Sequence, residues 1–122
     1  MRERRLGVRV PLEVMMTSYV RDRPVRALTY DLSDSGIGIS AVSMLAPRAG
    51  MVMSLELELP GLAESIWAKG EVCYQEPGTI ATGLGIRFLA MATAHARMVR
   101  DFCIETRRQH LGGLLARIRG VA

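Results

Sequence analysis

A short polar turn in the first third of the chain carries residue types that could hold a small ligand. Residues 29–40 read TYDLSDSGIGIS, and Asp31, Ser33 and Gly36 follow the spacing Asp-x-Ser-x-x-Gly. A carboxylate accepts hydrogen bonds, a hydroxyl donates them, and small residues let a ligand approach the backbone. The same residue types also form ordinary hairpin turns. This stretch alone therefore leaves both interpretations open.

Arginines near the N-terminus form a second group that could bind an anion. Arg5 and Arg9 have the spacing Arg-x-x-x-Arg, and Arg4 precedes them. A guanidinium offers a planar fork of donors that pairs with phosphate and stacks on flat rings. The chain has fifteen arginines and one lysine, so a solvated basic end is the alternative interpretation of this pair.

Taken together, the two groups resemble the motifs of the PilZ domain, the bacterial receptor module for cyclic di-GMP. That family carries Arg-x-x-x-Arg in an N-terminal segment and Asp-x-Ser-x-x-Gly further along the chain. The order and separation of the two motifs fit this sequence. The resemblance continues through the glycine-containing stretches at 70–72 and 83–88 to about Phe102, and so covers nearly the whole chain.

The resemblance implies ligand-binding roles for six residues, which are Arg4, Arg5, Arg9, Asp31, Ser33 and Gly36. Arginine can pair with phosphate, stack on guanine or donate to its O6 and N7. The resemblance further implies that Asp31 accepts from guanine, Ser33 donates to phosphate and Gly36 leaves room for the base. In this family, an arginine in the position of Arg4 favours an intercalated pair of dinucleotides over a single one.

Length, composition and charge limit the class of protein. A chain of 122 residues with 49% hydrophobic residues is long enough for one domain with one core, and a net charge of +4 allows an anionic partner. The charged N-terminus has no apolar signal region and no apolar run is long enough to cross a membrane, so we expect a cytoplasmic protein. Cys73 and Cys103 lack the spacing of metal ligands, and we expect both to be small buried apolar residues.

Apolar alternation predicts an all-β domain. Six strands are expected, at residues 7–20, 25–30, 36–41, 51–59, 65–75 and 79–89. Residues 51–59 alternate most clearly, with Met53, Leu55, Leu57 and Leu59 on the predicted buried face. Pro11 favours an edge position or a later start for the first strand, and Gly70 predicts a bulge or a bend. This pattern is typical of a barrel or a sandwich, and the resemblance implies a six-stranded antiparallel split barrel.

After residue 89 the pattern changes to helical spacing. His95, Met98, Val99, Phe102 and Cys103 form an apolar stripe on a helix expected at 92–110, which Gly112 and Gly113 should end. The stripe is wide for a helix on a small barrel, which suggests a homodimer through this helix. The sequence thus predicts one domain, with a flexible arginine-rich arm at 1–9, a barrel at 10–89, the helix, and a tail at 111–122.

The residues favour a binding protein over an enzyme. Both histidines, His95 and His110, lie in the C-terminal region, and no catalytic group, metal site or cofactor fingerprint is legible. The leading hypothesis is a stand-alone PilZ domain that binds cyclic di-GMP and relays the signal to a partner protein. The alternatives are a ligand-independent PilZ-like adaptor of pilus or motility machinery and, less favoured because aromatic residues are few, a basic nucleic-acid-binding barrel.

Overall fold

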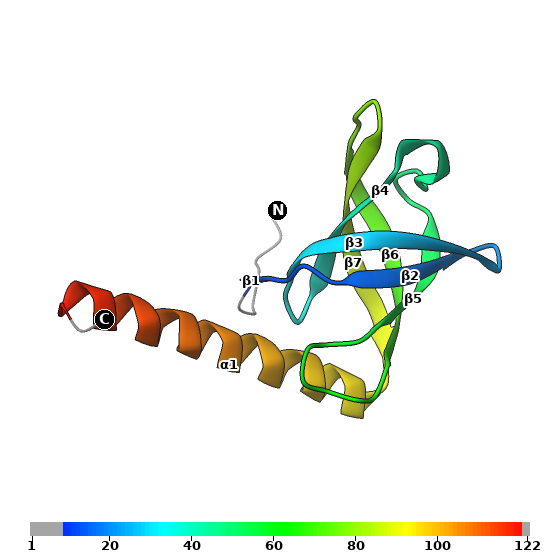
Figure 1. Ribbon diagram of the computed structural model, residues 1–122. Helices are drawn as coiled ribbons and strands as arrows, with labels where there is room; N and C mark the ends of the chain where they lie inside the picture. Colours follow the sequence, from blue (N-terminus) through cyan, green and yellow to red (C-terminus); the bar gives the residue numbers. More distant parts are fainter. Residues whose placement is uncertain (1–8, 121–122) are drawn as a thin grey trace, which may run out of the picture.

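The described part of the chain folds into seven β-strands followed by one long helix (Figure 1). The computed structural model describes residues 9–120. A short 3-10 helix, η1 (Ser43–Leu45), follows the fourth strand, and the C-terminal helix α1 spans Thr93–Ile118. The strands are β1 (Val10–Pro11), β2 (Met15–Val20), β3 (Arg23–Leu32), β4 (Gly36–Val42), β5 (Val52–Leu57), β6 (Ile66–Glu76) and β7 (Ala81–Met91).

Six of these strands close into an antiparallel barrel. Their order is β3-β2-β5-β6-β7-β4, and β4 pairs back with β3 to complete the ring. The two-residue β1 pairs with Asp31 and Leu32 at the end of β3, beyond the residues that pair with β2. The predicted fold class, an all-β six-stranded barrel with a C-terminal helix, is confirmed.

Alternation of side chains fills the barrel interior. In and just after β5, Met53, Leu55, Leu57 and Leu59 are all at most 4% exposed, as predicted. The intervening Ser54 and Glu56 are only partly covered. Burying each such aliphatic side chain contributes about 1.5–3 kcal/mol, so the period-two pattern fixes which face of the strand turns inward.

The first predicted strand, residues 7–20, is wrong as one element, because β1 and β2 are separated by residues 12–14. Pro11 has no backbone N–H and lies in the edge strand β1, as its residue type favours. Thr29 of β3 joins the two strands across the gap. Its buried hydroxyl accepts from the Val14 backbone N–H at 2.9 Å and donates to the Leu12 carbonyl at 2.5 Å.

The β6–β7 ladder contains two irregularities. One register shift falls between Lys69 and Gly70, where the bulge was predicted, and the other between Val72 and Tyr74. Cys73 lies at the second shift and is exposed, so the prediction that it is buried is wrong. The prediction for Cys103 is confirmed, since that residue is 2% exposed.

The helix is longer than predicted. It continues through Gly112 and Gly113 to Ile118, so the predicted end at residue 110 and the separate tail are wrong. Each glycine costs a helix about 1 kcal/mol relative to alanine, which weakens a helix without forbidding it. Val99 and Cys103 are its buried residues, and Met98 and Phe102 pack partly against the core. The C-terminal half of α1 extends beyond the barrel (Figure 1).

The two cysteines should differ sharply in reactivity. Burial, with a smaller contribution from Asp34, raises the pKa of the Cys103 thiol to about 11, so it carries little thiolate at neutral pH. We expect iodoacetamide to label Cys73 in the native protein and Cys103 only after denaturation, as read by peptide mass spectrometry. Labelling of both residues at similar rates under native conditions would contradict the packing of α1 on the barrel.

Candidate ligand-binding site

The turn between β3 and β4 is organised by one buried hydroxyl. Ser33 is fully buried, and its Oγ accepts from the backbone N–H groups of Ser35 and Gly36, both at 3.2 Å. The Ser33 N–H donates to the Gly36 carbonyl at 2.9 Å. These bonds hold the turn in one shape, which is the role that serine often plays in turns.

An ion pair joins the residue before β1 to the end of β3. Arg9 Nη1 lies 2.6 Å from Asp31 Oδ1, and the two side chains are 30% and 23% exposed. The pairing of Pro11 with Asp31 in the β1–β3 ladder brings the two residues together. Arg9 Nε is buried and has no hydrogen-bond partner within residues 9–120. Asp31 therefore orients a guanidinium that retains an unused donor there.

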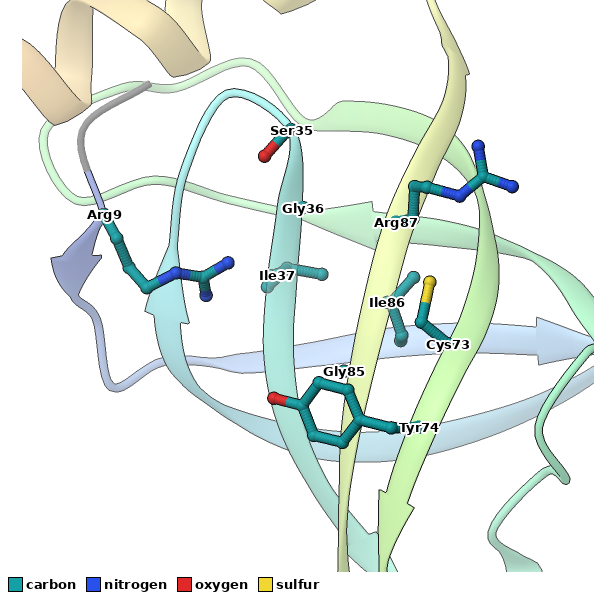
Figure 2. A pocket seen from close by; sticks show the side chains of 9 residues that line it. All are labelled: Arg9, Ser35, Gly36, Ile37, Cys73, Tyr74, Gly85, Ile86 and Arg87. Carbon is teal, nitrogen blue, oxygen red and sulfur yellow. The ribbon is translucent and has the colours of Figure 1, made fainter. Parts of the chain in front are cut away.

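A pocket of about 270 Å³ opens beside this ion pair (Figure 2). Its walls come from β4, β6 and β7, together with the residue that precedes β1. The residues that line it are Arg9, Ser35, Gly36, Ile37, Cys73, Tyr74, Gly85, Ile86 and Arg87. Two guanidiniums, a serine hydroxyl and a tyrosine ring with its own hydroxyl are thus gathered around one depression in the barrel surface.

Aromatic rings lie flat on glycines in this region. A Cβ atom on Gly85 would overlap the Tyr74 ring, and one on Gly38 would overlap the Tyr30 ring. Figure 2 shows the Tyr74 ring crossing β7 at Gly85. Tyr74 is 51% exposed, so one face of its ring is available to a planar ligand. Burial and the neighbouring Tyr74 hydroxyl raise the pKa of Tyr30 well above 10, which keeps its phenol neutral at physiological pH.

Arg87 supplies the second cation of the pocket. It forms an ion pair with Glu71, which raises the pKa of Arg87 further above its ordinary value. The Arg87 side chain is 48% exposed. In Figure 2, Arg9 and Arg87 flank the β4–β7 pair from opposite sides. A ligand with two separated anionic groups matches such a spacing of charges better than a single ion does.

The structure brings four of the six predicted residues into one region. Arg9 and Gly36 line the pocket, Asp31 contacts Arg9, and Ser33 lies inside the turn with its hydroxyl engaged by the backbone. Arg4 and Arg5, with most of the predicted flexible arm, lie outside the described residues. The ligand-binding roles of all six remain predictions.

The glycine of the turn motif, Gly36, is required by the packing of two strands. Gly36 is absent from the residues with positive φ within 9–120, and a Cβ there would instead overlap the carbonyl oxygen of Ile86 on β7. The close approach of β4 to β7 therefore requires this glycine.

Sequence reasoning missed Cys73, Tyr74 and Arg87 as pocket residues. They belong to β6 and β7, which are far from both motifs in the sequence. Tyr74 pairs with Gly85 only because the β6–β7 register shifts just before it. An aromatic residue across from a glycine is the signal that could have indicated a ring lying over the strand.

Comparison with known proteins places the chain in a family. Residues 3–105 match the PilZ domain, and the chain belongs to this family. Among solved structures, Bacillus subtilis inhibitor of motility (MotI/DgrA) superimposes with a TM-score of 0.75 at 21% identity, covering 88% of this chain and 52% of that one. No curated protein sequence matches the chain.

Two structures of Escherichia coli YcgR are also similar. YcgR in complex with c-di-GMP gives a TM-score of 0.70 at 17% identity, covering 92% of this chain and 50% of that one. The structure of the PilZ domain of YcgR with c-di-GMP gives a TM-score of 0.67 at 16% identity. It covers 92% of this chain and 98% of that one. The chain thus spans about half the length of MotI and of the longer YcgR structure, and the likeness establishes the fold.

Within residues 9–120, no helix is both long and apolar enough to cross a membrane. In the same range, no group of three or more histidine, cysteine, aspartate or glutamate side chains is arranged to hold a metal ion.

Gly36→Ala should destabilise the barrel, because the new methyl group would press on the Ile86 carbonyl where β4 and β7 meet. Overpacking of this kind costs about 1–3 kcal/mol. The matched control is Gly83→Ala, since a Cβ there meets only Glu76 at 3.5 Å, an ordinary contact. Urea denaturation of both variants measures the difference, and equal midpoints would contradict the close approach of β4 to β7.

Proposed function

We propose that this PilZ domain is a receptor for cyclic di-GMP. The observation that carries the proposal is the Arg9–Asp31 ion pair at 2.6 Å, held beside a pocket that also contains Arg87 and an exposed tyrosine ring. A cyclic dinucleotide has two phosphates and two planar bases, which suit two guanidiniums and an aromatic surface. The complex of YcgR with c-di-GMP supports the same ligand for a protein of the same fold.

Each predicted residue can be given a role in this site. Arg9, together with Arg4 and Arg5, pairs with phosphate or stacks on guanine. Asp31 Oδ1 already accepts from Arg9, so Oδ2 is the oxygen that we assign to the guanine N1–H and N2–H groups. Gly36 leaves room for the ligand at the base of the pocket, and any side chain at this position would displace the β4–β7 pair.

Ser33 and Ser35 have different proposed roles in the turn. The Ser33 Oγ already accepts two backbone N–H groups and is fully buried, which favours a role in shaping the turn over direct contact with phosphate. Ser35 lines the pocket, and its Oγ lies 3.1 Å from the Ser33 Oγ. We therefore propose that the Ser35 hydroxyl donates to phosphate and that Ser33 holds Ser35 in position.

The proposed output is binding to a partner protein. We propose that the domain acts as a cytoplasmic relay that needs no cofactor and catalyses no reaction, with the signal passing to an effector in motility, pilus, biofilm or exopolysaccharide control. A ligand-independent adaptor would present the same barrel without affinity for the nucleotide. Titration with cyclic di-GMP separates these two functions directly.

Cyclic di-GMP should bind the wild-type chain, and Arg9→Ala or Arg5→Ala should weaken binding at least tenfold, because a charge-assisted hydrogen bond contributes about 1.5–3 kcal/mol. Calorimetric titration measures both. The matched control is Arg48→Ala, which removes the same charge from an exposed position outside the pocket and should bind normally. The receptor function is wrong if the wild-type protein does not bind, and the site is wrong if Arg9→Ala and Arg5→Ala both keep full affinity.

Asp31→Ala tests whether the carboxylate recognises guanine or only orients Arg9. The measured quantity is the ratio of affinities for cyclic di-GMP and cyclic di-AMP. Adenine lacks the N1–H and N2 amine of guanine, so loss of a guanine contact should shrink this ratio. If Asp31 only holds Arg9, both nucleotides should lose affinity equally and the ratio should stay constant. We expect the ratio to fall, with partial retention in Asp31→Asn, which keeps one acceptor oxygen.

A further inference from the structure

The C-terminal half of α1 carries an exposed apolar stripe that no other described element covers. We call it the α1 seam and define it as Ile104, Leu111, Leu115 and Ile118, which are 41%, 43%, 49% and 71% exposed. With Arg108 included, successive positions along the seam are four, three, four and three residues apart. This alternation is the a/d spacing of helices that pair side by side. A shallow groove runs along it, lined by Ile104, Arg107, Arg108, Leu111, Gly112 and Leu115.

The barrel cannot cover the seam. Val99 and Cys103 face the core from the first half of α1. At about 100° of rotation per residue, Leu111 lies about 120° around the helix from Val99. Figure 1 also shows that this half of α1 projects away from the barrel. The apolar stripe predicted from the sequence, which ran from His95 to Cys103, is the barrel-facing surface, and the seam is a different one.

Two glycines weaken this segment of the helix, and one of them, Gly112, lies beside the seam. Gly112 and Gly113 lie in the helix interior, where glycine is less favourable than alanine. A Cβ atom on either would meet nothing within 4 Å in the described structure, so packing within the chain gives no reason for them. Helices that lack tertiary packing are marginal in water. A second helix against the seam would supply that packing, and the missing side chain of Gly112, which lines the groove, would let the backbones approach, whereas Gly113 lies on the opposite face of the helix.

We propose that the α1 seam pairs with the seam of a second copy of this chain, with the two helices antiparallel. Charge decides the orientation. A parallel pair would place Arg108, at a central position of the seam, against the partner's Arg108. An antiparallel pair centred on Gly112 and Gly113 avoids this contact. It sets Arg108 against the apolar end of the other seam. Glu105, which already pairs with Arg108 of its own helix at 3.0 Å, then also lies beside the partner's Arg119.

The antiparallel arrangement also suits the shape of the protomer. Because α1 projects from the barrel, pairing its outer halves leaves the two barrels at opposite ends of the paired helices (Figure 1). The candidate pocket is lined by β4, β6, β7 and Arg9, so it contains no seam residue and stays accessible. The dimer is therefore independent of nucleotide binding and does not rest on the proposed function.

Sedimentation velocity over a wide concentration range tests the dimer. We expect the wild-type chain to dimerise at high micromolar concentration. The variant Leu111→Glu/Leu115→Glu should dissociate at least about tenfold more readily, because it places carboxylates on the buried seam. Circular dichroism should show that it loses helix content while keeping its strands. The matched control is Ile80→Glu, which makes the same kind of change at a residue that is 81% exposed on the barrel and should leave the dimer intact.

Three outcomes would overturn the proposal. A wild-type monomer at submillimolar concentration would exclude a second copy as the occupant of the seam. A dimer that survives Leu111→Glu/Leu115→Glu would place the interface elsewhere. Equal dissociation of Ile80→Glu would show general apolar association.

Exchange of charges tests the orientation. Glu105→Arg or Arg119→Glu alone should weaken the dimer, because each brings like charges together at both ends of an antiparallel pair. The double variant should restore the dimer affinity, because the arginine at position 105 of each protomer then faces the glutamate at position 119 of its partner. If the double variant loses as much dimer affinity as the two single variants lose together, the helices are not antiparallel in this register.

Discussion

Strand β4 closes the barrel, and the rest of the structure depends on this closure. It hydrogen-bonds to β3 on one side and to β7 on the other, so the ring is complete only where β4 fits between them. The fit is tight at two glycines. A side chain on Gly36 would meet the Ile86 backbone, and one on Gly38 would meet Tyr30 and Asp31. The turn that leads into β4 is also tied to β7, because the Phe88 N–H donates to the Ser35 carbonyl at 2.9 Å. The residues that close the barrel are therefore also those that shape the candidate site.

The Arg9–Asp31 ion pair matters more for orientation than for stability. Partly exposed pairs contribute about 0–1 kcal/mol, because solvent screens the attraction and two side chains must be ordered. A guanidinium that is already aimed at a pocket, however, loses less conformational freedom when an anion binds. The pair also ties the start of the two-residue strand β1 to β3. Its main consequence is therefore the fixed direction of the guanidinium beside the pocket.

Local patterns predicted the elements, and non-local register decided the site. The alternation in β5 depends on neighbouring residues alone, so its buried face was predictable. The pocket instead needs β4, β6 and β7 side by side, and Tyr74 reaches Gly85 only after a register shift that no local pattern predicts. The burial of Cys73 was predicted from its residue type, and this prediction was wrong. The alternation along β6 places Cys73 on the same face as the exposed Lys69, and that pattern would have predicted its exposure. The helix end was wrong because two glycines weaken a helix without ending it.

The first half of α1 connects the candidate site to the seam physically. The Cys103 thiol contacts the Leu32 carbonyl at 3.6 Å, directly before the turn that Ser33 organises. Asp34 in that turn and Arg9 both act electrostatically on the same thiol. A ligand that repositions Arg9 or the turn therefore acts on atoms in contact with the buried part of α1. The buried part of α1 is thus anchored to the turn that shapes the candidate site, whereas the exposed seam residues of its outer half lie clear of that turn and of the pocket.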